Sequence, residues 1–299
     1  MIGELAALGA AICWTVSAIL YKEGLRSLKP ISANILRLTS TSILLLICIL
    51  AIGKIELLTS LPLNIAALAT LSGIIGLGLG DTLYMISLKC IGVARAVPIT
   101  CTYPLFTLLW TASLLNEPIG LQIVLGAVVI VFGIWLLSRE KESESNESSR
   151  GSLLKGVLAA LATAVVWSVS ITMMNLAVTL PEMNKLNYAF VINALRVSSI
   201  GLLMLILAPL TDRNYSFLKA NRKTLVSIIS GGVIALALGW FFLAASFLYI
   251  PEAQAVPISS TSPLFSAIAG IAFLHEKVTA KIVAGSTLVV VGVFLIFMA

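Results

Sequence analysis

The feature that most constrains this chain is a succession of apolar stretches, separated by short polar or charged breaks. A helix of about 20 mostly apolar residues is long enough to cross the hydrocarbon core of a bilayer. Ten such stretches fall at about residues 3–21, 32–52, 65–88, 94–115, 121–137, 153–173, 187–210, 225–248, 254–274 and 280–298. The chain is 59% hydrophobic and 11% charged, which is more apolar than a soluble domain. The sequence therefore predicts an all-α integral membrane protein with ten transmembrane helices.

The two halves of the chain are related by an internal repeat. GELAALGAAICWTVS (3–17) shares nine of fifteen residues with GVLAALATAVVWSVS (156–170), and ARAVPITCTYPLF (94–106) shares nine of thirteen with AQAVPISSTSPLF (253–265). Each copy holds five stretches, and an odd number makes the second copy enter the membrane from the opposite face. We therefore predict inverted five-helix repeats, an arrangement typical of secondary transporters. A duplicated scaffold without transport activity is the alternative.

One long polar stretch, REKESESNESSRGSLLK (139–155), lies between the copies. Its Ser and Glu residues cannot build a packed core, which predicts a flexible linker. The expected organisation is a first five-helix repeat at 1–138, a polar linker at 139–152 and a second five-helix repeat at 153–299.

A short set of motifs recurs in both copies. It consists of W-x-x-S in the first span, N-x-x-R early in the second, P-L-F in the fourth, a Glu soon after it, and two glycines seven residues apart in the fifth. This set resembles the EamA domain, and two such domains in tandem are similar to ten-span members of the drug/metabolite transporter superfamily. The resemblance implies a pseudo-two-fold helical bundle around a central cavity that works by alternating access. It does not specify the substrate among amino acids, other metabolites, nucleotide sugars and drugs.

Three charged residues lie more than one helical turn inside the predicted spans. Arg37 and Arg196 occupy matched positions in the two copies, so they either contact substrate or tie helices together. Asp81 is the one acidic residue well inside a span, and its counterpart in the second copy is Trp240. A carboxylate in low-dielectric surroundings takes up a proton more readily than in water. Asp81 is therefore a candidate for a coupling proton or a substrate ammonium group, with a buried ion pair to Arg37 as the alternative.

Several uncharged side chains are further candidates. Trp14 and Trp167 lie half-way through matched spans, where they either line a cavity or pack between helices. The other cavity candidates carry hydroxyl groups: Ser17, Ser170, Tyr84 and Tyr103. Asn34 and Asn193 are better suited to hydrogen bonds between helices, and the glycines of GIIGLGLGD predict close helix contact.

Two prolines interrupt the fourth stretch, and both recur in the ninth. Pro98 and Pro104 match Pro257 and Pro263. A proline inside a helix removes a backbone hydrogen bond and frees carbonyl groups, which the neighbouring Thr and Ser hydroxyls can satisfy. Proline-broken spans at equivalent places in two repeats indicate the binding site of a transporter. We expect these prolines to act as kinks or gates, although Pro98 and Pro257 are also placed to mark helix starts.

The same residues exclude other classes of protein. No Ser-His-Asp triad, H-E-x-x-H motif or catalytic carboxylate pair can be drawn, so we expect no catalytic residues and no enzyme. Four separate cysteines and one histidine give no metal site, and no cofactor is expected. Basic residues lie in loops rather than in aromatic-interleaved stripes, so nucleic acid is not an expected partner.

Lys and Arg are concentrated on one side of the predicted bundle. The breaks after the odd-numbered stretches hold fifteen of them, and the opposite face holds two. The positive-inside rule then places a multi-pass protein in the cell membrane with both termini outside. The predicted function is secondary active transport, preferably export, of small metabolites such as amino acids. The partners would be a small-molecule substrate, the lipid bilayer and a coupling proton, with monomer and dimer both open. A multidrug-type exporter and a scaffold or lipid-handling subunit are the alternatives.

Overall fold

The computed structural model describes residues 1–107, 110, 121–138, 150–180, 183, 185–263, 265, 266, 269 and 279–298. Over these residues the chain is helical, with turns between the helices, as predicted. The first half contains α1 (Ile2–Gly24), α2 (Pro30–Ala51), α3 (Ile55–Thr59), α4 (Leu63–Ser72), η1 (Gly73–Gly80), α5 (Asp81–Ile91), α6 (Val93–Thr100) and α8 (Leu121–Ser138). The second half contains α9 (Arg150–Thr179), α10 (Leu186–Thr211), α11 (Arg222–Gly232), η2 (Val233–Gly239), α12 (Trp240–Ser246), α13 (Glu252–Ser259) and α15 (Ala280–Phe297).

Six helical stretches are long and apolar enough to cross a membrane, counted over the described residues. They are α1, α2, the continuous run of α4, η1 and α5, then α9, α10, and the continuous run of α11, η2 and α12. Two shorter apolar helices, Val124–Leu137 and Ala280–Leu295, lie within α8 and α15. The predicted spans 94–115 and 254–274 lie partly outside the described residues. A multi-pass membrane protein follows from these helices, and the count of ten spans stays a prediction.

The outer surface of the bundle is apolar. On α2 the side chains of Ile43, Ile47 and Leu50 are exposed, and on α8 those of Val128 and Val131 are exposed. Water disfavours such continuous apolar faces, whereas lipid tails solvate them. The side chains that a soluble protein would bury therefore face the bilayer.

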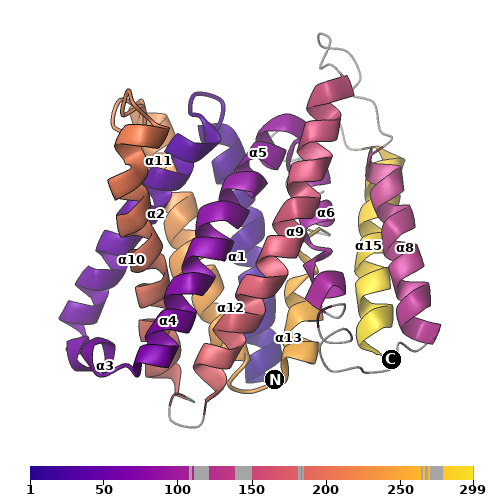
Figure 1. Cartoon of the computed structure of the whole chain (residues 1–299). Helices are drawn as coiled ribbons and strands as arrows, with labels where there is room; N and C mark the ends of the chain where they lie inside the picture. Colours follow the sequence, from indigo (N-terminus) through magenta and orange to yellow (C-terminus); the bar gives the residue numbers. More distant parts are fainter. Residues whose placement is uncertain are drawn as a thin grey trace.

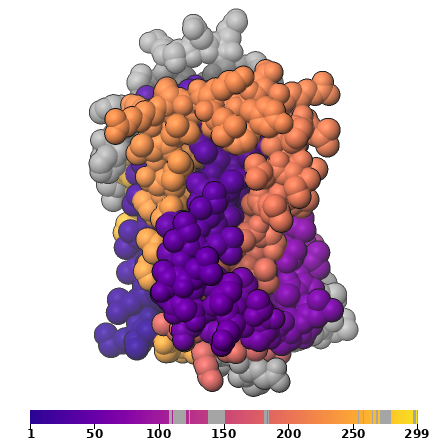
Figure 2. Space-filling model, turned by 90° about the vertical axis from the view of Figure 1, so that its left-hand side faces the viewer, coloured from indigo at the N-terminus to yellow at the C-terminus, as the bar shows by residue number. Residues whose placement is uncertain are grey.

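The two halves run in opposite directions and interlock. In Figure 1 both chain termini lie at one end of the bundle, and α8 ends and α9 begins at the other end. α1 therefore runs antiparallel to its counterpart α9 (Figure 1). Figure 2 shows the dark segment of α2 and α3 flanked on both sides by segments of the second half, and α2 packs against α10 and α11. The core of the bundle is thus formed by both halves together.

A wide, π-helical segment interrupts the third long stretch of each half. η1 covers Gly73–Gly80 and η2 covers Val233–Gly239, which are matched positions of the repeat. Widening a helix disturbs its regular hydrogen bonds, and π-type turns are frequent at functional sites. The asparagines of the repeat bond to these segments: Asn34 Nδ2 donates to Leu77 O (2.9 Å), and Asn193 Nδ2 donates to Leu236 O (2.9 Å). Both therefore make the predicted interhelical hydrogen bonds.

Glycines allow the closest helix contacts, as the sequence predicts. A Cβ atom at Gly76 would lie 2.1 Å from Ser170 Oγ, and one at Gly80 would lie 2.8 Å from the Trp167 ring. On the α8–α15 pair, a Cβ at Gly133 would lie 2.8 Å from Gly285 O. These positions have no room for a side chain, so the helices approach each other there through their backbones.

The fourth and ninth stretches are broken between their two prolines. Pro98 lies inside α6, the helix turns at residues 101 and 102, and helical structure resumes at Tyr103 with Pro104 in its first turn. The second half repeats this arrangement: α13 contains Pro257, the turn is at 260 and 261, and Pro263 follows it. The first proline of each pair therefore lies well inside a helix rather than marking its start. Proline fits the first turn of a helix because its missing N–H has no partner there.

Hydroxyl groups bond to the carbonyls just before each break, as predicted. Thr100 Oγ1 donates to Val97 O (2.9 Å) and Thr102 Oγ1 to Ile99 O (2.7 Å). In the second half, Ser259 Oγ donates to Val256 O at 2.9 Å. Val97 O and Val256 O also accept backbone N–H groups, from Cys101 and Ser260. A carbonyl that a proline frees is Ser259 O, four residues before Pro263, and it accepts a bond from Ser262 Oγ at 3.1 Å.

Candidate functional site

A small enclosed cavity lies between the two halves. It is lined by Trp14, Ser17, Tyr21, Arg37, Asp81, Tyr84, Val97, Thr100, Cys101 and Tyr103 of the first half, and by Trp167, Ile171, Ala235, Leu236, Trp240 and Ser262 of the second. The volume of the cavity, taken as the space open to the centre of a water-sized sphere, is about 40 Å³. One water needs roughly 10–15 Å³ by the same measure. The cavity thus has room for only a few water molecules, and an organic molecule requires it to open.

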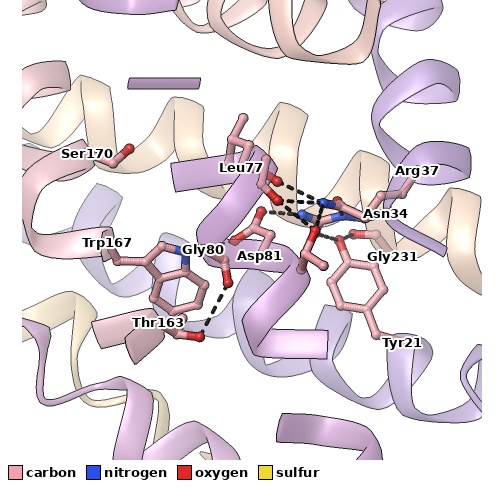
Figure 3. Close-up of polar contacts among 12 residues, drawn as sticks. Tyr21, Asn34, Arg37, Leu77, Gly80, Asp81, Thr163, Trp167, Ser170 and Gly231 are labelled. Carbon is pink, nitrogen blue, oxygen red and sulfur yellow. Dashed lines mark hydrogen bonds and ion pairs between the residues drawn. The ribbon is translucent and has the colours of Figure 1, made fainter. Parts of the chain in front are cut away.

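A buried ion pair lies at the cavity wall. Arg37 Nη2 donates to Asp81 Oδ2, with both side chains almost fully buried. The other guanidinium nitrogens are also bonded: Nε to Asn34 Oδ1 (2.8 Å) and Nη1 to the Tyr21 hydroxyl (2.9 Å). Figure 3 shows these groups converging from α1, α2 and α5. Of the two roles predicted for this arginine and this aspartate, the ion pair between them is present in this structure.

The second oxygen of the aspartate joins the two halves. Trp167 Nε1 donates to Asp81 Oδ1 at 2.8 Å, and Figure 3 shows the indole ring of α9 directed toward the carboxylate. Both carboxylate oxygens are therefore occupied, one from each half of the chain. This arrangement couples the position of α9 to that of α5, so a change in the charge of Asp81 affects contacts in both halves.

Aromatic rings form part of the remaining wall. Trp14 meets Trp240 edge-on at 5.4 Å between centroids, and Tyr84 packs against Trp167 at 5.1 Å. Both predicted tryptophans thus line the cavity. Tyr103 also lies there, and its hydroxyl is 2.7 Å from Ser259 Oγ. That contact brings the fourth and ninth stretches together beside their proline breaks.

Arg196 has different surroundings from its counterpart Arg37. Its Nε donates to Ser72 Oγ (2.9 Å) and its Nη2 to Ser170 Oγ (2.8 Å). Nη1 has no hydrogen-bond partner among the described residues, and the side chain is fully buried. The guanidinium instead lies over the indole of Trp240, with Cζ 3.7 Å from the ring centroid. The second half therefore contains a buried cation on an aromatic face where the first half has an ion pair.

The structure separates the predicted site residues into two groups. Those at the cavity wall are Trp14, Ser17, Arg37, Asp81, Tyr84, Tyr103 and Trp167. Arg196 and Ser170 are not among the lining residues: they bond to each other and to Ser72 between α10, α9 and α4. Pro98, Pro104 and Pro263 are located near the two helix breaks and are not among the lining residues, and Pro257 lies within α13.

Three further residues were not singled out as candidates from the sequence. Tyr21 lies seven residues after Trp14, so both are on the same face of α1, and that spacing could have identified it. Trp240 was noted only as the counterpart of Asp81. Glu252, in the first turn of α13, accepts a hydrogen bond from Asn175 Nδ2 (2.5 Å), and the sequence pattern gave no sign of this pair.

These observations define a class of protein: a helical membrane bundle built from an internal repeat, with a polar and aromatic cavity between its halves. The chain belongs to the EamA-like transporter family, whose pattern it matches over residues 1–139 and 154–298. This membership confirms the resemblance found in the sequence.

The comparisons with known proteins agree with this membership. An uncharacterized transporter of Archaeoglobus fulgidus is 26% identical over 303 residues, covering 100% of this chain and 99% of the relative. The uncharacterized transporter YvbV of Bacillus subtilis is 23% identical, covering 95% of this chain and 88% of the relative. A solved crystal structure is similar with a TM-score of 0.69 at 19% identity, covering 98% of this chain and 95% of that one. At this identity the last similarity bears on the fold alone.

Proposed function

We propose that this protein is a secondary active transporter that exports small metabolites, such as amino acids, by alternating access. The observation that carries the proposal is the enclosed cavity whose wall is shared by both halves and contains the Arg37–Asp81 pair. A cavity built from two antiparallel repeats can open to either side when one half moves against the other. Family membership and the two transporter relatives support transport rather than catalysis.

The proposed cycle uses the contacts at the two helix breaks. The bond between Tyr103 and Ser259 holds the fourth and ninth stretches together in this closed arrangement. Breaking it would let the segments beyond the turns at 101–102 and 260–261 swing apart. In this proposal Asp81 is the coupling residue, because a change in its charge would weaken its bond to Arg37 and loosen the wall.

We propose the cell membrane as the location, with both termini outside. In the sequence, fifteen Lys and Arg residues fall in or next to the breaks after the odd-numbered apolar stretches, against two after the even-numbered ones. The two termini lie together at the end away from the start of α9 (Figure 1). The positive-inside rule then assigns the end at which α9 begins to the cytoplasm.

Flux measurements in proteoliposomes test the proposal. Purified protein should give saturable uptake of a radiolabelled amino acid or other small metabolite, and Asp81→Asn should reduce it and remove its response to a pH gradient. Flux that is unchanged in Asp81→Asn across pH would exclude Asp81 as the coupling group. Absence of saturable flux for every compound in a broad metabolite panel would contradict transport.

Labelling of the native residue Cys101 distinguishes a transporter from a scaffold. Cys101 lines the cavity, and the other three cysteines can be removed as Cys13→Ser, Cys48→Ser and Cys90→Ser. A transporter should expose Cys101 to a maleimide intermittently, at a rate that substrate changes. A scaffold should leave it unreactive or unaffected by any solute. A multidrug-type exporter, the second candidate, would show this response with hydrophobic cations rather than with metabolites.

A further inference from the structure

The two equivalent arginines differ in whether their charge is neutralised. All three nitrogens of Arg37 have acceptors, including a carboxylate. Arg196 has two serine hydroxyls and no ion-pair partner among the described residues, and its Nη1 has no acceptor at all. Both side chains are fully buried. A buried cation without a counterion is strongly disfavoured, so this arrangement is suited to a partner that the chain itself does not supply.

Two differences within the repeat accompany this contrast: the positions that match Asp81 and Tyr21 of the first half hold Trp240 and Met174. Asp81 begins α5 and supplies the counterion of Arg37, and the matched position at the start of α12 is Trp240. The indole face attracts the guanidinium of Arg196, but it leaves the in-plane N–H donors of Nη1 unsatisfied. An oxyanion in the guanidinium plane satisfies those donors and neutralises the charge.

The buried charged side chains at the centre of the bundle also indicate an unneutralised positive charge. The buried charged side chains in the described chain are Arg37, Asp81, Arg95, Arg196 and Asp212. Arg95 and Asp212 lie near helix ends, where Arg95 Nε bonds to Ile91 O and Asp212 follows the last turn of α10. After Arg37 and Asp81 cancel, Arg196 leaves one positive charge among these central three, while the carboxylate of Glu252 is bonded separately to Asn175 and Thr172. One monoanionic group restores neutrality there.

Trp240 connects this cation to the cavity. The indole contacts the guanidinium of Arg196 and also lines the cavity wall, next to Trp14. Movement of this one side chain would open the cavity toward Nη1. The rest of the wall combines aromatic rings, such as Trp167 and Tyr84, with aliphatic side chains and hydroxyl groups, and it suits an apolar or aromatic body better than a second charge.

We propose that Arg196 is the anion-binding residue of the transport site and that the transported compounds carry a carboxylate, held by its guanidinium, on an apolar or aromatic body. This proposal rests on the transport function argued above and specifies its substrate class. Asp81 does not compete for the ligand, because both its oxygens are already bonded to Arg37 and Trp167.

Binding measurements on the purified full-length protein test the assignment with matched pairs of probes. Benzoate, phenylacetate and phenylalanine are each compared with their neutral carboxamides by calorimetry and by thermal shift. We expect the best carboxylate to bind at least about tenfold more tightly than its amide. Arg196→Gln should abolish this preference, whereas Arg26→Gln, at an exposed arginine outside the cavity, should retain it. Equal affinity for acid and amide across the panel, or an unchanged preference in Arg196→Gln, would overturn the proposal.

A second pair of variants isolates the charge from the shape of the pocket. Trp240→Asp gives Arg196 a carboxylate in the position that Asp81 has relative to Arg37, and Trp240→Asn makes the same change in size without the charge. We expect the preference for carboxylates to disappear in Trp240→Asp and to remain in Trp240→Asn. The same preference in both variants would contradict a role for the unpaired charge of Arg196.

Counterflow in proteoliposomes distinguishes failure of this inference from failure of the proposed function. Saturable movement of amides and carboxylates at equal rates would leave transport intact and refute the carboxylate class. Binding of carboxylates through Arg196 without movement of any probe would leave the anion site intact and contradict transport. A merely structural Arg196 would make Arg196→Gln less stable without changing the selectivity of binding or flux.

Discussion

Removing one member of the Arg37–Asp81 pair should cost far more stability than removing an arginine at the membrane surface. Arg37→Gln leaves the carboxylate of Asp81 buried, with the indole of Trp167 as its one remaining donor among the described residues. Arg26 is the matched control: it pairs with Glu23 at 3.1 Å, and its side chain is 63% exposed.

The burial of each pair sets the size of the effect. Two unit charges about 4 Å apart attract by about 4 kcal/mol at an effective dielectric constant of about 20. Breaking a buried pair by removing one partner costs about 3–5 kcal/mol, because the remaining charge stays in a low-dielectric interior. An exposed pair contributes about 0–1 kcal/mol. We therefore expect Arg37→Gln to lower the free energy of unfolding by about 3 kcal/mol or more, and Arg26→Gln by less than about 1 kcal/mol.

Unfolding in mixed detergent and sodium dodecyl sulfate, followed by circular dichroism, measures both values. The double variant Arg37→Gln with Asp81→Asn completes a double-mutant cycle, and it should be less destabilised than the sum of the two single variants. The reasoning fails if Arg37→Gln is no more harmful than Arg26→Gln, or if the two single effects at the buried pair simply add.

Two other predictions concern helix packing and the loop after α10. A Cβ at Gly73 would lie 2.4 Å from a backbone oxygen of α10, so Gly73→Ala should lower the free energy of unfolding by about 1–3 kcal/mol. Gly9→Ala is the control: a Cβ there would lie 3.3 Å from the ring of Phe242, so this variant should lower the free energy by less. Equal thermal stabilities of the two variants would contradict this prediction. Burial raises the pKa of Asp212, but hydrogen bonds from Ser216 and Phe217 outweigh it and hold the pKa below its ordinary value. A carboxyl group whose pKa is lowered by folding stabilises the fold at pH values above its pKa in the unfolded chain, which is about 3.9 for Asp. The stabilisation by Asp212 should therefore be lost as the pH falls below about 4. Asp212→Asn should therefore lower the melting temperature at neutral pH and reduce the dependence of that temperature on acid. If the melting temperatures of the wild type and the variant fall in parallel as the pH is lowered, Asp212 does not make this contribution.

The fold was predictable from the sequence wherever its pattern repeats. The apolar stretches gave the long helices, and the matched prolines placed the two breaks in corresponding segments. The wide segments η1 and η2 were not predicted, because glycines in an apolar run indicate close packing without showing how many residues each turn contains. Some predicted spans were shorter than the helices that contain them. For example, α9 begins at Arg150, three residues before the expected start of the second repeat.

The candidate site was predictable in part. Trp14, Asp81 and Trp167 lie at one cavity, as expected from their positions along the spans. The contact between α9 and α5 through Trp167 and Asp81 could not be inferred, because a single sequence gives no information about which helices of the two halves are neighbours. The sequence also could not assign different surroundings to Arg37 and Arg196, since their local motifs are alike.

The difference between the two arginines shows where a repeat protein can place its chemistry. Residues shared by both halves, such as Asn34 and Asn193, bond to the same backbone positions and maintain the architecture. A departure from that symmetry places a chemical group in one half of the site only. The replacement of an acid by Trp240 is such a departure: it removes a counterion from one half while the other half retains it in Asp81. If the carboxylate proposal holds, exchanging the residues at these two positions should move the anion-binding residue from Arg196 to Arg37.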